Sequence, residues 1–204
     1  MKRFQNKMNL KKISFFVLLI AITMSGCGFQ SLPQSKNTVE AALAEITNQY
    51  KRRADLIPNI VETVKGYAQH EKETLAEVVT ARAKATQITI DPSKTSAAQL
   101  MEYQKNQAGL SQALGRLMVV AEKYPDLKAN QNFRDLQVQL EGTENRITVA
   151  RNRYIQAIQE FNNLVTVPFT SWTNSLIYKY EKMPQWSVSD EEKAKVEKAP
   201  EVKF

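Results

Sequence analysis

Residues 133–164, FRDLQVQLEGTENRITVARNRYIQAIQEFNNL, decide the fold of this chain. Along this stretch, apolar or small side chains recur at alternating steps of three and four residues: Phe133, Leu136, Leu140, Thr143, Ile147, Ala150, Tyr154, Ala157, Phe161 and Leu164. Because a helix completes a turn in about 3.6 residues, this spacing places all of them on one side of a helix. The pattern predicts a long helix whose apolar side packs against other long helices.

Two earlier stretches show the same spacing. The shorter consists of Leu100, Tyr103, Gln107, Leu110, Leu114, Leu117, Ala121 and Tyr124. The longer consists of Leu43, Ile46, Tyr50, Arg53, Ile57, Ile60, Val64, Tyr67, Glu71, Thr74, Val78, Ala81, Ala85 and Ile88. Since the longer pattern keeps its phase across Pro58, we predict a single helix kinked at this proline. A break near Asp55, with Pro58 in the first turn of a new helix, is the alternative.

Short polar and proline-containing segments mark the helix ends. Residues 88–92 end the first helix, Thr95 or Ser96 caps the second, residues 124–126 end the second, Asn130 caps the third and Pro168 ends the third. We therefore expect an all-α fold over residues 38–181. It is an elongated antiparallel bundle of three long helices plus a short C-terminal helix.

The C-terminal region divides at about residue 181. Residues 171–180 predict a short helix that packs Trp172 and Leu176 over the core. An interfacial contact of these aromatic residues with lipid is the alternative, which is disfavoured because the membrane anchor lies at the other terminus. Residues 182–204 mix acids and lysines without an apolar pattern, which indicates a disordered tail.

The N-terminus has the three parts of a secretory signal. Five cations precede residues 13–24, an uncharged and mostly apolar run that is shorter than the about 20 residues of a membrane span. Residues 24–27, Met-Ser-Gly-Cys, resemble the bacterial lipobox, which implies lipidation of Cys27 and cleavage before it. We predict a lipoprotein signal peptide over residues 1–26 and a polar tether over residues 27–37. An uncleaved anchor, in which Cys27 is incidental, is the alternative.

The lipobox resemblance also implies where the protein resides. A lipoprotein of this type is bacterial and extracytoplasmic. Gly28, which follows the cysteine, favours the periplasmic face of the outer membrane in a Gram-negative host. In a Gram-positive host the protein would lie on the outer face of the plasma membrane.

Composition excludes several classes of function. The formal charge is +7, but Lys2, Arg3, Lys7, Lys11 and Lys12 lie in the first 26 residues without an acid, which leaves 23 cations against 21 acids, or +2. This balance predicts no nucleic-acid interface. One cysteine and one histidine exclude disulfide frameworks, zinc clusters and Cys–His nucleophiles. A di-metal site in a helical bundle needs two Glu-x-x-His pairs, so we expect neither metal nor cofactor.

Three blocks of sequence resemble the LemA family. They are RRADLIPNIVETVKGYAQHEKETL at residues 52–75, ARAKA at 81–85 and AEKYPDLKANQNFRDLQVQLEGTENRITVARNRY at 121–154. The resemblance covers residues 38–170 and implies a helical, membrane-associated bacterial protein without an established enzymatic activity. Typical members resemble proteins with an uncleaved single span, so the lipobox departs from the family pattern. The sequence of residues 161–168 departs from it as well.

Two charges on the apolar side of the first helix suggest a site. A buried charge costs several kcal/mol unless it is paired, yet Arg53 and Glu71 occupy apolar positions. Either both reach water or each meets an opposite charge on the third helix, or they mark a polar pocket. We predict such a partner-binding groove from Arg53, Asp55, Asn59, Glu122 and Asn132.

Helix lengths place this groove at one end of the bundle. Short loops impose antiparallel neighbours, and counting back from Ile88 at about 1.5 Å per residue puts Tyr124 opposite Ile60. Segments 52–62 and 122–133 would then meet on the side of the tether.

These observations favour a lipid-anchored, extracytoplasmic scaffold or adaptor that binds another envelope protein. A carboxylate-dependent envelope enzyme using Glu122, Asp126, Glu141 and Glu144 is one alternative, and a small-ligand carrier is another. No nucleophile, phosphate-binding loop or oxyanion motif accompanies the carboxylates, so we expect no enzymatic activity.

Overall fold

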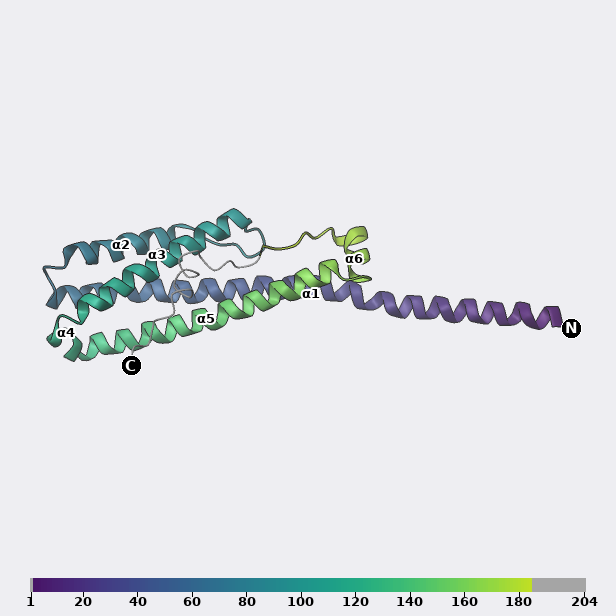
Figure 1. Ribbon diagram of the computed structural model, residues 1–204, viewed down its shortest axis with the longest axis horizontal. Helices are drawn as coiled ribbons and strands as arrows, with labels where there is room; N and C mark the ends of the chain where they lie inside the picture. Colours follow the sequence, from purple (N-terminus) through teal and green to yellow (C-terminus); the bar gives the residue numbers. More distant parts are fainter. Residues whose placement is uncertain (1, 185–204) are drawn as a thin grey trace, which may run out of the picture. The chain divides into compact units, whose positions relative to one another are not determined.

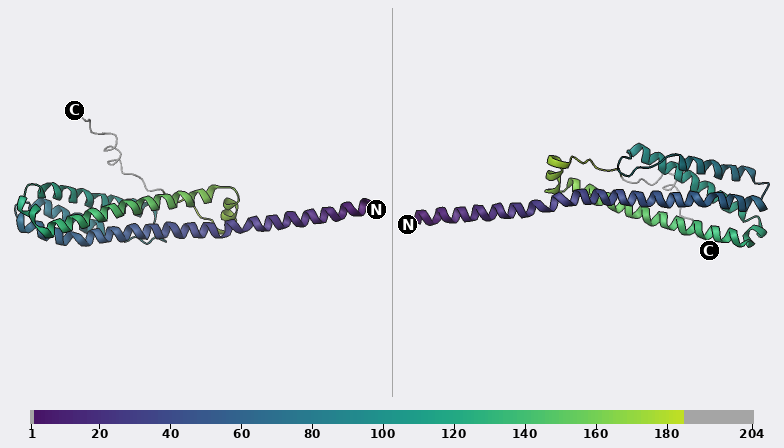
Figure 2. Two further views of the ribbon diagram at one scale, coloured as in Figure 1. Left: turned by 90° about the horizontal axis from the view of Figure 1, so that it is seen from below. Right: turned by 180° about the vertical axis from the view of Figure 1, so that it is seen from behind.

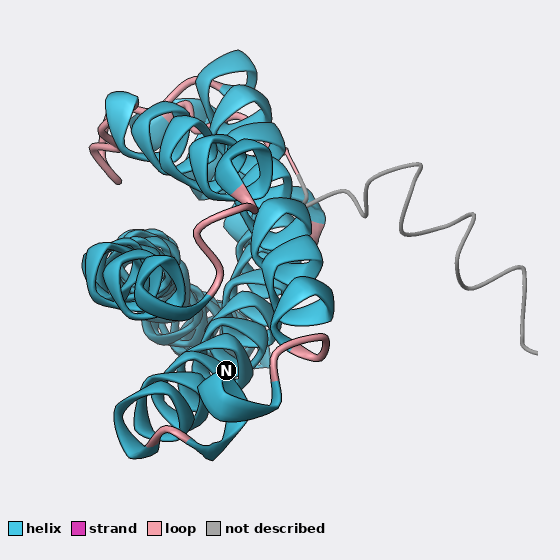
Figure 3. Ribbon diagram, turned by 90° about the vertical axis from the view of Figure 1, so that its left-hand side faces the viewer, coloured by secondary structure: helices cyan, strands magenta, loops and turns pink. Residues whose placement is uncertain are grey.

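The computed structural model describes residues 2–184, in which all regular secondary structure is helical (Figure 3). In chain order the elements are α1 (Lys2–Tyr67), α2 (Lys72–Gln87), α3 (Ala97–Ala121), α4 (Pro125–Ala129), α5 (Gln131–Thr166), α6 (Thr170–Thr173) and the π-helix η1 (Asn174–Tyr178) (Figure 1). This arrangement confirms the predicted all-α fold.

The described residues form two compact units. The first unit contains α1 up to Val39 together with Gln156–Met183, and the second contains Glu40–Ile155. Helices α1 and α5 therefore contribute residues to both units.

In the second unit, the long helices α1, α2, α3 and α5 run antiparallel, each to the long helix before it in the chain (Figures 1 and 2). Its core takes buried side chains from every helix, including α4: Ile57, Ile60, Val64, Val78, Leu110, Leu117, Leu127 and Phe133. On α5 the predicted apolar side is buried along its length, except that Leu136 and Leu164 are half-buried. The assignment of faces on the 133–164 helix is thus confirmed.

The predicted first helix is wrong in one respect, because two helices take its place. α1 ends at Tyr67, the chain turns through residues 68–71, and α2 returns from Lys72. Gly66 lies at this end, and glycine costs about 1 kcal/mol relative to alanine inside a helix. The break is hidden in the sequence because Leu75, Val78 and Ala85 of α2 are also buried. The bundle consequently has four packed helices where three were expected.

Helix α1 passes through Pro58 without ending, as the continuous phase predicted. Proline has no amide hydrogen, so the carbonyl of Ala54, four residues earlier, loses its helical donor. Arg82 of α2 supplies a replacement, since its Nε donates a 2.9 Å hydrogen bond to the oxygen of Ala54. The return of α2 therefore satisfies the acceptor that proline exposes.

The helix caps follow the predicted residues. Ser96 caps α3 in a reciprocal arrangement with Gln99, whose backbone donates to the Ser96 side chain while its own side chain accepts from the Ser96 amide. Asn130 caps α5, because its Oδ1 accepts the Phe133 amide at 3.0 Å. Helix α5 ends at Thr166, two residues before Pro168. The extra turn α4 was not predicted.

In the first unit, the expected tether at residues 27–37 belongs to α1. Leu32, Ser35 and Val39 are buried, and they extend the spacing of three and four residues back from Leu43. The polar composition of this segment concealed the single apolar position per turn that holds a helix against its neighbours. Within residues 2–184, no helix combines the length and apolar character needed to cross a membrane. Residues 185–204 of the predicted tail lie outside the described residues.

Candidate functional site

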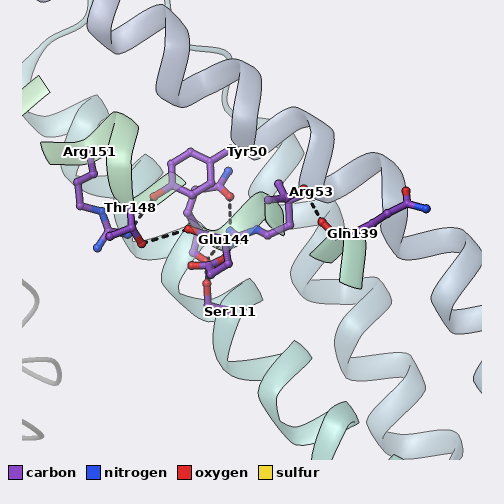
Figure 4. A network of polar contacts seen from close by, with 9 residues as sticks. Tyr50, Arg53, Ser111, Gln139, Glu144, Thr148 and Arg151 are labelled. Carbon is purple, nitrogen blue, oxygen red and sulfur yellow. Dashed lines mark hydrogen bonds and ion pairs between the residues drawn. The ribbon is translucent and has the colours of Figure 1, made fainter. Parts of the chain in front are cut away.

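A buried arginine links three helices of the second unit. Arg53 of α1 is 1% exposed, and its Nη1 donates to Ser111 Oγ at 2.7 Å and to Glu144 Oε2 at 2.9 Å (Figure 4). Its Nη2 donates to the side-chain oxygen of Gln107 at 2.8 Å and to the Gln107 carbonyl at 3.1 Å. The guanidinium thus joins α1 to both α3 and α5.

Gln107 extends this network to the fourth helix. Its Nε2 donates a 3.0 Å hydrogen bond to the carbonyl of Ala85, in the last turn of α2. Carbonyls in the last turn of a helix lack an intrahelical donor, so the amide satisfies a group that would otherwise be unpaired. Through Arg53 and Gln107, polar contacts connect α1, α2, α3 and α5.

Aromatic rings cover one side of the guanidinium. The Tyr50 ring lies 4.9 Å from Arg53 Cζ, a cation–π distance, and contacts Tyr103 edge to face at 5.6 Å. The Tyr50 hydroxyl accepts from Arg151 Nη2 at 3.4 Å. Burial, followed by the neighbouring Tyr50, raises the pKa of Tyr103, while Arg53 acts in the opposite direction. Burial alone raises the pKa of Tyr154, farther along α5, to about 12.

This arrangement suits a structural role better than ligand binding. Arg53 is closed off from solvent, and its anionic partner Glu144 is 49% exposed, so the pair spans from the interior to the surface of the bundle. Arg53 therefore meets an opposite charge on the third predicted helix, which was one of the interpretations left open. Glu71, the other unusual charge, is half-buried and accepts from the Tyr124 hydroxyl at 3.2 Å.

The residues of the predicted groove differ in exposure. Arg53 is buried, whereas Asp55, Asn59, Glu122 and Asn132 are exposed. Glu122 forms an ion pair with Lys128 of α4, the short helix that follows it. Among the described residues, Arg53 has no hydrogen bond or ion pair with any other member of the proposed set.

The expected meeting of segments 52–62 and 122–133 is also wrong. The turn after α3 contacts the end of α1, because Asn130 Nδ2 donates to the Tyr67 hydroxyl at 2.8 Å and Tyr124 donates to Glu71. The length argument failed because it counted a continuous helix back from Ile88. The chain in fact reverses at residues 68–71, so the turn lies at the carboxyl-terminal end of α1 in this unit.

The candidate catalytic carboxylates have separate partners. Glu122 pairs with Lys128, Glu144 with Arg53, and Glu141 accepts from the Gln137 amide at 2.9 Å. Asp126 is exposed in the first turn of α4. Within the described part of the chain, no group of three His, Cys, Asp or Glu side chains is arranged to hold a metal ion.

A second feature lies in the first unit, where the sequence predicted packing and the structure shows exposure. Trp172 is 62% exposed and Leu176 is 80% exposed, so the prediction that they cover the core is wrong. Asn174 is buried instead, and its side chain donates to the Tyr180 carbonyl at 2.8 Å and accepts the Tyr180 amide at 2.9 Å. This two-way contact turns the neighbouring apolar side chains outward.

An identical contact fixes the chain that follows. The Asn162 side chain donates to the Met183 carbonyl at 2.9 Å and accepts the Met183 amide at 2.8 Å. The ring of Tyr180, whose backbone makes the first of these two contacts, lies 5.9 Å from the ring of Phe161 and 5.1 Å from the Lys36 amino group. Residues 179–183 are therefore held against both α5 and α1 within the first unit.

A further feature of the first unit is a shallow cleft of about 320 Å³ at the end of α5. It is lined by Gln156, Gln159, Glu160, Asn163, Leu164, Val167 and Thr170. These side chains include one carboxylate and several amides without a cluster of charged groups.

Comparison with known proteins gives two matches. The sequence model described as the LemA family matches residues 42–204, which extends beyond the residues 38–170 that carry the resemblance noted above. Protein LemA of Metamycoplasma hominis (strain ATCC 23114 / DSM 25592 / NBRC 14850 / NCTC 10111 / PG21) is 27% identical over 173 residues. The alignment covers 82% of this chain and 74% of the relative.

Proposed function

The chain belongs to the LemA family, and from this premise we propose that it is a lipid-anchored, extracytoplasmic scaffold that binds another protein of the cell envelope. The observation that carries the proposal is the continuity of α1. This single helix runs from Cys27 into the first unit, where Leu32, Ser35 and Val39 are buried. A lipid anchor at Cys27 would therefore hold these packed residues of the first unit within a few helical turns of the membrane.

Lipidation at Cys27 would make the attachment durable. Each buried acyl methylene contributes about 0.8 kcal/mol, and one chain binds reversibly whereas two or more bind stably. Substitution of Cys27 by serine should abolish incorporation of labelled fatty acid and leave a larger, unprocessed precursor. Acylation and processing of the Cys27→Ser protein to the normal size would show that the anchor has another origin.

The binding role rests on the outer faces of the helices. The interior charge at Arg53 is used by contacts within the bundle, so a partner must meet exposed side chains. On α5, Val138 and Val149 are exposed and lie 11 residues apart, which is close to three turns and puts them on the same side. Gly142 lies between them in sequence, and the Arg146 guanidinium covers it. This side of α5 suits an amphipathic helix of an envelope protein.

Site-specific photocrosslinking in intact membranes tests this role. A photoreactive residue at Val138 should give one defined protein adduct, while the same residue at the neighbouring exposed position Gln139 should not. The adduct should disappear when Val149 is changed to lysine. Equal adducts from positions 138 and 139, or none from either, would reject binding through this side of α5.

A further inference from the structure

Five large apolar side chains are exposed just after α5. They are Val167, Phe169, Trp172, Leu176 and Ile177. We propose that this segment, residues 167–177, inserts these side chains into the interfacial layer of the bilayer that holds the N-terminus. The inference rests on the proposed membrane anchoring and adds a second point of contact with the same membrane.

The exposure is built into the local structure. Trp172 and Leu176 are four residues apart, so they lie on one side of the short helical turn. Buried Asn174 lies between them in sequence and is held to the Tyr180 backbone, which fixes the opposite side inward. Phe169 has a φ of 72° and its ring meets that of Trp172 edge to face at 5.3 Å. Phe169, Trp172 and Leu176 thus form one exposed apolar group, and Val167 and Ile177 lie beside it in sequence.

The position of this group within the first unit points to the membrane. Tyr180, only three residues after Ile177, packs its ring against the amino group of Lys36. Lys36 follows Cys27 by nine residues, or about 14 Å of helix. Figures 1 and 2 show α6 beside α1, close to where α1 continues alone toward the N-terminus. A lipid anchor and an uncleaved anchor would both bring this end of the unit to the bilayer surface.

The composition of the segment fits the same location. Tryptophan and phenylalanine favour the boundary between headgroups and acyl chains, and lysines nearby favour anionic lipid. Lys179 and Lys182 follow the segment in sequence, with Glu181 between them, and Lys36 lies against Tyr180. Distance in sequence from the anchor argued against a lipid contact, but the packing of Tyr180 on α1 removes that objection.

Tryptophan fluorescence of the full chain in vesicles tests the proposal. Trp186 is changed to phenylalanine so that Trp172 alone reports, and the protein is reconstituted in equimolar phosphatidylcholine and phosphatidylglycerol. We expect Trp172 emission to shift to the blue and to be quenched when the phosphatidylcholine carries bromine on its acyl chains. Substitution of Phe169, Leu176 and Ile177 by serine should abolish the quenching, whereas serine at the exposed Val119 of α3 should not.

Flotation of the same vesicles separates the two proposals. Protein that floats with the lipid while Trp172 stays unquenched would overturn the second contact and leave the anchoring intact. Protein that does not float would overturn both. A blue shift that appears without lipid and resists brominated lipid would assign the segment to a protein contact and also reject the proposal.

Discussion

Replacing Arg53 by methionine should destabilise the bundle by about 2–4 kcal/mol, because it leaves hydrogen-bond acceptors inside the bundle without their donor. Methionine fills most of the volume, so the loss is chiefly polar. The substitution leaves the side-chain oxygens of Gln107 and Ser111 without the donors that now lie 2.8 and 2.7 Å away, whereas the Gln107 carbonyl still accepts from the Ser111 hydroxyl. Each buried acceptor left unpaired costs about 1–3 kcal/mol.

The partner carboxylate should also matter. Glu144→Gln leaves the Arg53 guanidinium, which is 1% exposed, without its counter-charge, although Ser111 and Gln107 still accept from it. Leaving a buried charge uncompensated costs about 3–5 kcal/mol, and the half-exposed position of the carboxylate lowers this value. We therefore expect a loss of about 3 kcal/mol for Glu144→Gln, comparable with that for Arg53→Met.

Urea unfolding of the detergent-solubilised chain, followed by helical circular dichroism, measures both values. The comparison requires that the free energy of unfolding fall with urea concentration at the same slope in all variants, because a changed slope would indicate a changed unfolded state. In a double-variant cycle, Arg53→Met and Gln107→Leu should be less costly together than the sum of the single losses, since the leucine removes the orphaned acceptor. An Arg53→Met loss below about 0.5 kcal/mol, as at an ordinary surface site, would refute the reasoning.

Three other tests follow from the packing and from the tyrosines. Ile147→Ala should cost about 2–5 kcal/mol in the same unfolding experiment, because Ile147 is fully buried, whereas Gln139→Ala should stay within about 0.5 kcal/mol; equal losses would contradict the assigned face. Cysteines at Tyr67 and Asn130, with the native cysteine replaced, should form an intramolecular crosslink with a short reagent, and failure to do so would contradict the reversal of the chain at residues 68–71. Burial raises the pKa of Tyr154 to about 12, against about 10 in the unfolded chain, so the unfolded chain loses the phenol proton first. The free energy of unfolding should therefore fall as the pH rises from 10 toward 12, and Tyr154→Phe should lessen this fall. The same pH dependence in both proteins would contradict a raised pKa at Tyr154.

The faces of the helices could be predicted from the sequence because each apolar side chain repeats at the helical period. The break between α1 and α2 could not, since a chain that reverses after a whole number of turns can keep the same apparent phase. Gly66 was the local signal for it, although glycine also occurs inside α3 at Gly109 and Gly115. Periodicity identifies which side of a helix is buried and does not identify its direction.

The polar network could be predicted only in part. Arg53 and Gln107 both occupy positions that the apolar spacing reserves for the core, and these exceptions identify where a buried polar contact must form. Their partners lie on other helices, and spacing within one helix carries no information about which residues face each other across the bundle. The outward side chains near Trp172 were missed for a similar reason, since they depend on the contact between Asn174 and Tyr180.

The position of Arg53 suggests why a costly buried cation is present in a bundle with an adequate apolar core. Repeats of seven residues allow neighbouring helices to slide by one repeat with little loss of apolar contact. In the second unit, α1 runs parallel to α3 and antiparallel to α5 (Figure 1). A slide of α1 by seven residues would place Arg53 opposite Leu114 and Gln137, or opposite Leu100 and Arg151. Either shift removes the carboxylate from a cation with 1% exposure, so only one register pairs the charge. The Arg53→Met variant should consequently retain its helices while losing this selection, and faster amide hydrogen exchange in α1 and α5, out of proportion to the lost stability, would be its signature.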